Sequence, residues 1–228
     1  MALGIPTSVK GFFRPTDAWF YDRYIAPAVL QWVYRASLDL EPAFARAERV
    51  LDVGCGGGQY LCEVVLRHPR AAIVGVDNSP DMVRRANERL RQLNRPASAV
   101  VASALDLPFS EGEFDMVVSV ASIKHWPDQA RGLAEMCRVL KPGGTLLVVE
   151  ADRGARVEDV EGFVGNLAFP RTMKPALPAL VPLVRTFVHG RSLDLDEARS
   201  LARGLPLEGA RAERVTEAPA LRIVGTKR

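Results

Sequence analysis

Short apolar runs alternate with stretches of helical periodicity through the middle of the chain. Each run has the length of a buried strand, and the stretches between the runs place apolar residues every three or four positions, as helices do. The pattern predicts five strands near these residues: Arg49–Val53, Ala71–Asp77, Ala97–Ala102, Glu113–Val120 and Gly144–Glu150. Helices are expected to begin near Gly58, Ser79 and Pro127. Strands that alternate with helices in this way predict a parallel sheet with helices on both faces.

The regions on either side of this core have a different pattern. Residues Thr16–Leu40 carry aromatic and aliphatic positions at helical spacing and predict an N-terminal helical cap, which Pro27 kinks or divides. After the core, Glu158–Gly204 is predicted to be helical, and Ala210–Thr216 and Ala220–Thr226 are predicted to be two closing strands. We expect four segments, namely a cap, a core, a helical insertion and the closing strands: 1–45, 46–152, 153–207 and 208–228.

The ten residues VLDVGCGGGQ, Val50–Gln59, join an apolar strand to a cluster of glycines. Glycine permits a turn with positive φ and lets a ligand approach the main chain, while the helix that follows presents free backbone amides. A dinucleotide-binding turn would have glycine or alanine at Gln59, and a phosphate-cradling loop would have lysine followed by serine or threonine. Neither phosphate signature fits this turn.

Two carboxylates stand at the ends of the first two predicted strands. Asp52 lies beside the glycine turn, where a carboxylate can hold a cationic amine. Asp77 ends the run AAIVGVD, at the position that hydrogen-bonds ribose hydroxyls in folds of this kind. A site that binds an amine and a ribose suits a nucleoside that bears an amino acid better than it suits a pyrophosphate.

Four ordered motifs between Val50 and Glu150 resemble those of class I S-adenosylmethionine-dependent methyltransferases, especially the small-molecule, methyltransferase type 11-like branch. The motifs are VLDVGCGGGQ, VGVDNSPDM, ALDLPFSEGEFDMVVSV and EMCRVLKPGGTLLVVE. The resemblance implies an α/β, Rossmann-like fold: a doubly wound, mostly parallel seven-stranded sheet with an N-terminal helical cap and a helical lid insertion before the last two strands. It also implies S-adenosylmethionine as the cofactor.

The resemblance further implies which residues hold this cofactor. Those expected near its methionine part and ribose belong to the first two strand ends: Asp52, Gly54, Cys55, Gly56 and Asp77. The residues expected around the adenine are Asn78, Met82, Ala104 and Leu105. Val120, at the end of the fourth predicted strand, completes the set. Ser103 stands where the family usually has the aspartate that accepts the adenine amino group. Because a hydroxyl can still accept that bond, we expect weaker adenine recognition at Ser103.

Composition fits one globular domain with appendages. The 228 residues are 48% hydrophobic and 25% charged, which allows a substantial core. The formal net charge of +3 falls short of a nucleic-acid footprint, and no stretch approaches the roughly 20 apolar residues of a membrane span. We therefore expect neither a nucleic acid nor a membrane as a partner, a cytoplasmic location, and a monomer or homodimer. Cys55, Cys62 and Cys137 lack metal-ligand spacing, so we expect free thiols and no metal site.

The segment SVASIKHWPD, Ser119–Asp128, follows the fourth predicted strand and is expected to face the transferred methyl group. Methyl transfer needs mainly alignment and exclusion of water, and only some acceptors need a general base. His125 is a candidate base because an imidazole takes up a proton near neutral pH, and a cofactor contact or a helix cap is its alternative role. Lys124 is a second candidate if it is buried, although we expect it to be an exposed surface charge. Trp126 is expected to pack beneath the loop.

The helical insertion carries an apolar stripe and a group of basic residues. The stripe, which Pro182 must distort, consists of Leu177, Leu180, Val181, Val184, Phe187 and Val188. It predicts a helix packed on the sheet edge, a lid over the acceptor, or both. The basic residues, with no acidic residue among them, are Arg171, Lys174, Arg185, His189 and Arg191. If one or two of them face inward, an apolar acceptor with a carboxylate would suit the pocket.

Together these features predict methyl transfer to a small, largely apolar metabolite. An oxygen acceptor is favoured because His125 can serve as its base, while carbon, nitrogen and sulfur acceptors stay open. One alternative is an RNA or protein methyltransferase, which the lack of an appended recognition domain and of an N/D-P-P-Y motif disfavours. The others are a non-catalytic S-adenosylmethionine-binding regulatory protein and a nicotinamide oxidoreductase, the latter disfavoured by Gln59.

Overall fold

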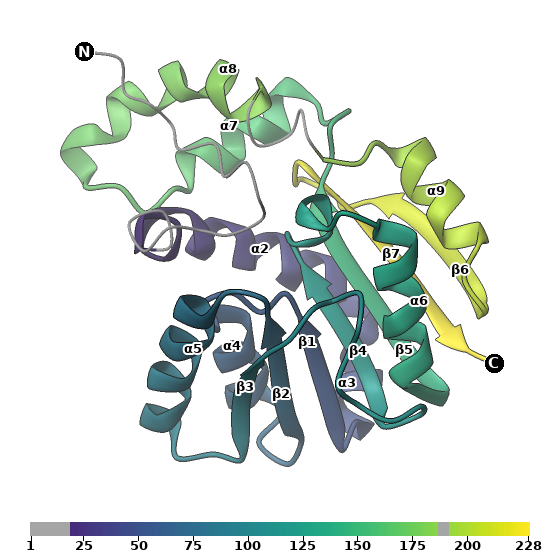
Figure 1. Ribbon diagram of the computed structural model, residues 1–228. Coiled ribbons are helices and arrows are strands. Elements are labelled where there is room, and N and C mark those ends of the chain that lie inside the picture. The colour runs from purple at the N-terminus through teal and green to yellow at the C-terminus, as the bar shows by residue number, and fades with distance from the viewer. Residues whose placement is uncertain (1–18, 187–191) are drawn as a thin grey trace.

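The computed structural model describes residues 19–186 and 192–228. Its strands form one seven-stranded sheet in the order β3-β2-β1-β4-β5-β7-β6 (Figure 1). The strands are β1 (Arg49–Val53), β2 (Ala72–Asp77), β3 (Ala97–Val101), β4 (Phe114–Val120), β5 (Leu140–Ala151), β6 (Leu207–Arg214) and β7 (Ala220–Lys227). The first five strands are parallel, whereas β7 runs antiparallel to β5 and to β6. The predicted fold, a mostly parallel seven-stranded sheet, is confirmed.

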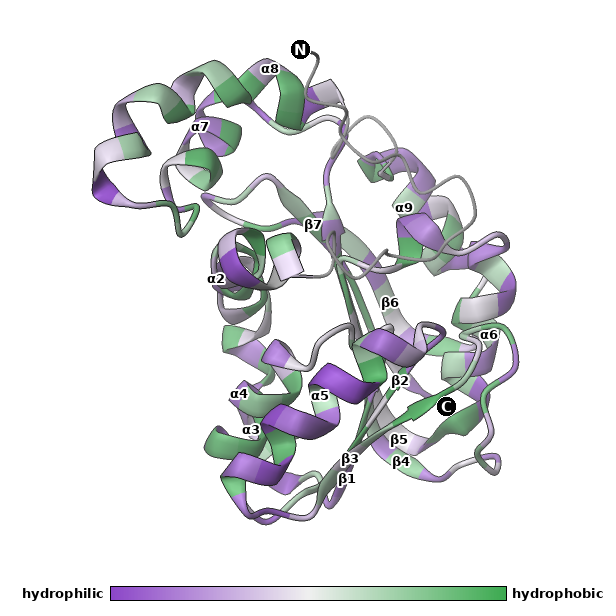
Figure 2. Cartoon of the chain, turned by 60° about the vertical axis from the view of Figure 1, so that its left-hand side comes forward, coloured by the Kyte–Doolittle hydropathy of each residue, from purple (hydrophilic) through white to green (hydrophobic). Residues whose placement is uncertain are grey.

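Helices cover both faces of the sheet. On one face lie α2 (Ala26–Ser37), α3 (Glu41–Arg46), α4 (Gln59–Arg67) and α5 (Pro80–Leu93), and on the other lie α6 (Gln129–Val139) and α9 (Leu195–Arg203). Side chains of a strand point alternately to the two faces, so each strand supplies both cores. In β4, Met116 and Val118 pack with α2, α4 and α5, while Val117 packs with α6 and α9. Figure 2 shows apolar residues concentrated along the strands between the helical layers.

Local capping signals set where the core helices begin. The hydroxyl of Ser79 accepts from the amide of Met82, and Pro80 occupies the first turn of α5, so this helix begins near Ser79 as predicted. Asp128 caps α6 by accepting from the amide of Arg131 at 2.9 Å. Each cap satisfies a backbone donor that the first turn leaves free, so sequence alone locates these helix starts well.

The N-terminal cap consists of a π-helical turn, η1 (Tyr21–Ile25), that continues into α2. Pro27 lies in the first turn of α2, where its missing amide costs no helical hydrogen bond, so it marks the start of the α-helix. One side of α2 is buried against the sheet through Val29, Trp32 and Val33. Two short helical elements, η2 (Leu38–Leu40) and α3, then lead into β1.

The predicted helical insertion is broken into separate pieces. It contains α7 (Val157–Gly165), a 3-10 helix η4 (Arg171–Leu180) and α8 (Val181–Val184), which stand beyond the upper edge of the sheet above α2 (Figure 1). Pro175, Pro178 and Pro182 account for the break, because proline lacks an amide donor and clashes with the preceding helical turn. The remaining helix, α9, packs on β6 and β7 and so completes a face of the sheet.

The apolar stripe of the insertion faces the core, as a packed helix requires. Leu177 and Val181 are buried, and Leu180 and Val184 are partly buried against the core cluster that includes α2. Phe187 and Val188 lie outside the described residues. Figure 2 shows this helical layer from a second side, set over α2.

The three described basic residues of the insertion are absent from the lining of the pockets discussed below. Arg171, Lys174 and Arg185 are exposed, so these three do not meet the condition that one or two basic residues face inward. Arg191 and His189 lie outside the described residues. The inference that the acceptor carries a carboxylate required an inward-facing cation. These three side chains therefore give it no support.

Candidate cofactor site

The turn between β1 and α4 is built on glycines with positive φ. Gly54 has a φ of +77° and Gly58 a φ of +81°, a region that other residues rarely adopt. The amides of Gly54 and Cys55 both donate to the carbonyl of Val76, at 2.8 and 2.9 Å, which ties the turn to β2. A Cβ at Gly54 would lie 1.8 Å from Oγ of Ser122. Glycine is thus required for the loop after β4 to reach the turn.

Asp77 ends β2 and points at the glycine turn. Its Oδ2 accepts from the amide of Gly56 at 3.0 Å, and its Oδ1 accepts from the amide of Ser79 at 2.9 Å. Burial raises the pKa of Asp77, and the two amide donors oppose that rise. Each carboxylate oxygen keeps a further lone pair, so Asp77 can bind two hydroxyl groups without losing either amide. The geometry fits a ribose diol.

Asp52 lies in β1 next to the glycine turn, in register with Gly75 of β2. Its side chain is buried, and neither carboxylate oxygen has a hydrogen-bond partner among the described residues. Burial, together with the nearby charge of Asp77, raises the pKa of Asp52 from 3.8 to about 8. A buried carboxylate without a partner is costly, and a cationic group would relieve that cost. Asp52 therefore fits the amine of an amino-acid-bearing nucleoside.

A narrow pocket opens at the carboxyl ends of β1, β2, β3 and β4. It lies where the strand order reverses between β1 and β4, the usual ligand position in an open α/β sheet. Seven predicted site residues line it: Gly54, Asp77, Asn78, Ser103, Ala104, Leu105 and His125. Its volume is about 80 Å³, below the several hundred Å³ typical of ligand pockets. A nucleoside can enter only if a wall of the pocket moves outward.

Ser103 holds the short turn on the adenine side of this pocket. Its hydroxyl oxygen accepts from the amide of Leu105 at 3.1 Å. A hydroxyl oxygen has two lone pairs, so Ser103 keeps one for a ligand donor. The aspartate usual at this position in the family would offer more acceptor sites, so weaker adenine recognition at Ser103 stays a prediction.

Four other predicted contacts lie outside the pocket lining, as Asp52 does. Cys55 is buried, and burial raises the pKa of its thiol well above the ordinary range. Gly56 holds Asp77 through its amide, and Met82 is buried in the first turn of α5. Val120 is partly buried against the core. These residues shape the turn and its support, and their contact with a cofactor remains a prediction.

The loop after β4 is anchored by a buried ion pair. Nζ of Lys124 donates to Oε1 of Glu150 at 2.8 Å, and the Lys124 amide donates to Oε2 at 3.2 Å. The Glu150 side chain is 0% exposed and that of Lys124 only 11% exposed. The expectation that Lys124 is a surface charge is therefore wrong, because its ammonium group neutralises a buried carboxylate on β5. Lys124 is not among the pocket-lining residues.

His125 follows Lys124 at the mouth of the pocket. It ends a single 3-10 turn, η3 (Ile123–His125), and its amide donates to the carbonyl of Ser122 at 2.9 Å. The residue is exposed and lines the pocket, so its imidazole is accessible to an entering ligand. Of the two candidate bases, the structure therefore brings only His125 to the pocket.

Sequence reasoning missed Ser122 as a pocket residue and assigned Trp126 only a packing role. The indole Nε1 of Trp126 donates to Oγ of Ser122 at 3.1 Å, and both residues line the pocket with Pro127. The indole ring also packs against Gly132 of α6, where a Cβ would lie 2.4 Å from it. The only sequence signal for this wall was its position directly after β4.

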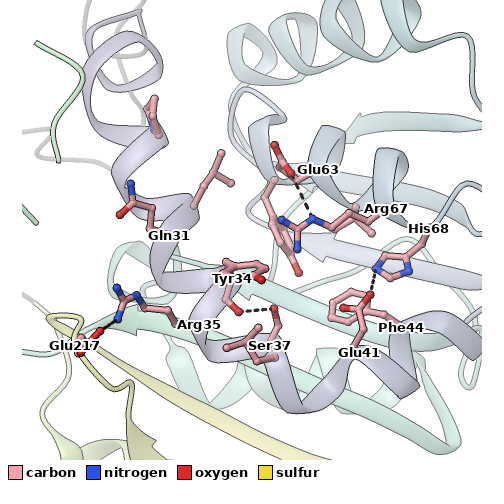
Figure 3. A pocket seen from close by; sticks show the side chains of 15 residues that line it. Gln31, Tyr34, Arg35, Ser37, Glu41, Phe44, Glu63, Arg67, His68 and Glu217 are labelled. Carbon is pink, nitrogen blue, oxygen red and sulfur yellow. Dashed lines mark hydrogen bonds and ion pairs between the residues drawn. The ribbon is translucent and has the colours of Figure 1, made fainter. Parts of the chain in front are cut away.

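A larger cavity of about 710 Å³ lies elsewhere, between α2, α3 and α4 (Figure 3). Its charged side chains pair with one another: Arg35 with Glu217, Arg67 with Glu63 and His68 with Glu41. It contains none of the predicted site residues. The smaller pocket is the candidate functional site, because the ends of four parallel strands meet there and seven predicted site residues line it.

A comparison with known protein families shows which family the core residues resemble. A family model described as "Methyltransferase domain" matches residues 51–148, which include the glycine turn, Asp77 and the pocket loops. Residues 51–148 belong to this methyltransferase family. The sequence-based family prediction is confirmed.

The curated relatives match mainly this methyltransferase region. A tocopherol O-methyltransferase from Arabidopsis thaliana is 39% identical over 109 residues, which are 46% of this chain and 30% of the relative. A demethylmenaquinone methyltransferase from Thermus thermophilus is 36% identical over 124 residues, which are 54% of this chain and 55% of the relative. The chain thus spans between about a third and about half of these relatives.

Solved structures extend the likeness to almost the whole chain. A SAM-dependent methyltransferase from Aquifex aeolicus has a TM-score of 0.64 at 17% identity, with 93% of this chain and 98% of that chain covered. A Haemonchus contortus phosphoethanolamine N-methyltransferase, determined with S-adenosylhomocysteine and phosphomonomethylethanolamine, has a TM-score of 0.67 at 16% identity, with 97% of this chain and 61% of that chain covered. At these identities the likeness shows the fold.

Three further expectations concern cysteines, metals and membrane spans. The three cysteines are free thiols, as predicted. Within residues 19–186 and 192–228, no three His, Cys, Asp or Glu side chains gather closely enough to hold a metal ion. Among the same residues, no helix has both the length and the apolar character needed to cross a bilayer.

Proposed function

We propose that this chain transfers a methyl group from S-adenosylmethionine to a small, largely apolar acceptor. The observation that carries the proposal is the pair of carboxylates at the glycine turn. Asp77 is oriented by two backbone amides and can bind a diol, while the buried Asp52 has no partner in the described part of the chain and suits a cationic amine. The methyltransferase family of residues 51–148 and the S-adenosylhomocysteine bound in a structural neighbour support the same cofactor.

The bound cofactor would supply a methyl group already activated by its sulfonium. The protein then has to orient that methyl group and keep water away. The main chain at Gly54 would contact the amino-acid part, Asp77 the ribose, and Ser103 with Leu105 the adenine edge. Ser122 and Trp126 would close the remaining side and exclude water, because they form the wall that faces Gly54.

The acceptor is proposed to lie between the N-terminal cap and the lid. Tyr24 of η1 stacks on Phe169, with ring centroids 4.6 Å apart and planes only 6° apart, and the Ala168 amide donates to the Tyr24 carbonyl. These contacts hold the two elements together with an aromatic wall, which favours an apolar, ring-bearing acceptor. A rice relative, 36% identical over 132 residues, is named as a 2-methyl-6-phytyl-1,4-hydroquinone methyltransferase, which supports a hydroquinone-like acceptor.

An oxygen is the acceptor atom that we favour, with His125 as its general base. His125 lies at the pocket mouth and can accept a hydroxyl proton as the oxygen attacks the methyl group. Removing a general base usually lowers turnover by about 10² to 10⁴-fold. His125→Ala is therefore expected to reduce turnover while the affinity for the cofactor stays the same. Equal loss of both would make His125 a binding residue.

The direct test is a transfer assay with methyl-labelled S-adenosylmethionine and three separate acceptor sets: small hydroquinones, total RNA and a protein extract. Label in the hydroquinones alone supports the proposal, and NMR of the product distinguishes O-methylation from C-methylation. Label in RNA or protein would overturn it in favour of a macromolecular substrate. Cofactor binding without transfer to any set would favour the regulatory alternative. We also propose that the protein works in the cytoplasm, as a monomer or homodimer.

A further inference from the structure

The lid segment, residues 171–185, exposes apolar side chains to solvent. Met173 is 50% exposed and Leu183 is 37% exposed, and Pro178 and Pro182 are exposed between them. Buried residues of the same segment, Leu177 among them, already satisfy its packing on the core. The exposed apolar side chains therefore do not contribute to that packing.

Basic residues alternate with these apolar side chains. Arg171, Lys174 and Arg185 are exposed, and the segment contains no aspartate or glutamate. None of the three forms an ion pair with another described residue. The acidic residues of the lid layer, which we define as α7, η4 and α8, lie on α7 instead: Glu158, Asp159 and Glu161. The lid segment thus carries three positive charges with no compensating charge of its own.

An exposed aromatic pair adjoins the start of this segment. Trp19 is 52% exposed and Phe20 is 43% exposed, and the Phe20 ring lies 6.0 Å from that of Phe169, two residues before η4. Large aromatic side chains settle at the boundary between water and lipid headgroups, where apolar and polar surroundings meet. The surroundings of the lid segment are therefore rich in groups that suit such a boundary.

We propose that the lid segment docks on the surface of a membrane that contains anionic phospholipid. The three cations complement anionic headgroups, and Met173 and Leu183 can insert among the acyl chains next to them. A nucleic acid would also complement the charges but would leave the exposed aliphatic groups in water. The proposal revises the expectation that no membrane is a partner, which rested on the lack of a spanning segment. It does not depend on methyl transfer, because docking is measured by itself.

Vesicle flotation tests this proposal with the full chain. Vesicles of phosphatidylcholine with 30% phosphatidylglycerol are compared with vesicles of phosphatidylcholine alone, each at low and high salt. We expect binding to the anionic vesicles that weakens as salt rises. The double variant R171Q/K174Q should bind about 25-fold more weakly, since each cation near an anionic surface contributes about fivefold. M173S/L183S should lower binding while the salt dependence stays.

A matched variant, R91Q/R95Q, removes two exposed positive charges at the far end of α5. It should bind vesicles as the unaltered protein does, and all variants should keep the same thermal midpoint because the altered side chains are exposed. Equal weakening by R91Q/R95Q would show that net charge alone drives binding and would overturn the lid assignment. No binding to anionic vesicles, or binding to RNA in place of vesicles, would overturn the proposal itself.

Discussion

The glycine-turn edge of the sheet and the lid layer differ in the burial and pairing of their polar groups. At the edge, the polar groups are partly or fully buried: two amides orient Asp77, Lys124 neutralises Glu150, and Asp52 has no hydrogen-bond partner among the described residues. In the lid layer, the cations of residues 171–185 are exposed and unpaired within the described chain. The edge carries oriented polar groups for one small ligand, which enters once a wall of the pocket moves outward, whereas the lid presents a surface to something larger.

This contrast in burial predicts which substitutions change stability and cofactor affinity. A buried polar group has only its protein partner, so removing that partner costs the full desolvation of the group left behind. An exposed group exchanges its partner for water at little cost. Edge variants should therefore alter stability and cofactor affinity strongly, and lid variants should leave both nearly unchanged.

The largest expected effect at the edge is the loss of the Lys124–Glu150 pair. Lys124→Met leaves Glu150 buried without its cation and should lower the free energy of unfolding by about 3 to 5 kcal/mol, as measured by urea denaturation. Arg84→Met, which removes an exposed pair with Glu88, is the control and should cost no more than about 0.5 kcal/mol. Similar values for the two variants would contradict the anchoring role of Lys124.

Next in size is the steric effect of a side chain in the turn. Gly54→Ala places a Cβ against Ser122 at a positive φ and should weaken S-adenosylmethionine binding about 100-fold or more, about 2.7 kcal/mol. Gly56→Ala is the matched variant, because it shares the positive φ but meets no atom within 4 Å. In Gly56→Ala, backbone strain alone should lower the free energy of unfolding by about 1 to 2 kcal/mol. Calorimetric titration of both variants makes the comparison.

A smaller loss of cofactor affinity should follow removal of Asp77, the residue proposed to bind the ribose. Asp77→Ala frees the amides of Gly56 and Ser79 and deletes the acceptor of the diol, which should weaken cofactor binding by about 1 to 3 kcal/mol. The same calorimetric titration measures it. Unchanged affinity would refute the placement of the ribose at Asp77.

The pH dependence of binding should reveal Asp52. In the free protein its pKa is about 8, so at pH 7 the carboxyl is mostly protonated and must lose its proton to hold a cationic amine. The affinity for S-adenosylmethionine should therefore rise by up to about tenfold per pH unit below 8 and level off above it. Binding at pH 7 should release a proton, seen by calorimetry in buffers of different ionisation enthalpy. Asp52→Asn should abolish that release, and a release that persists would point to another group.

The smallest effect is expected in the lid. Leu183→Ser replaces an exposed apolar side chain and should change the free energy of unfolding by no more than about 0.5 kcal/mol, with cofactor affinity unaltered. Thermal unfolding and calorimetry measure the two quantities. A large loss of cofactor affinity in Leu183→Ser would contradict the prediction that lid variants leave the cofactor site unaltered.

Local patterns explain what the sequence could predict. The buried strand at Val50, the cap at Ser79 and the acid that ends β2 all depend on neighbours along the chain, and the structure has them in place. The 3-10 form of η4 was harder to foresee, because Pro175 and Pro178 exclude a regular α-helix without specifying what replaces it.

Contacts between distant segments explain what the sequence could not predict. The burial of Lys124 depends on Glu150, 26 residues away, and the role of Ser122 depends on its approach to Gly54 from the loop after β4. No spacing in the chain encodes either meeting. Both are consequences of strand order, in which β1, β4 and β5 are neighbours.

The most direct test of the account is calorimetric titration of the purified protein with S-adenosylmethionine, S-adenosylhomocysteine and NADH. The carboxylates at the glycine turn and the lack of a pyrophosphate signature predict that the first two bind and that NADH does not. Binding of NADH alone, or of none of the three, would contradict the assignment of the site.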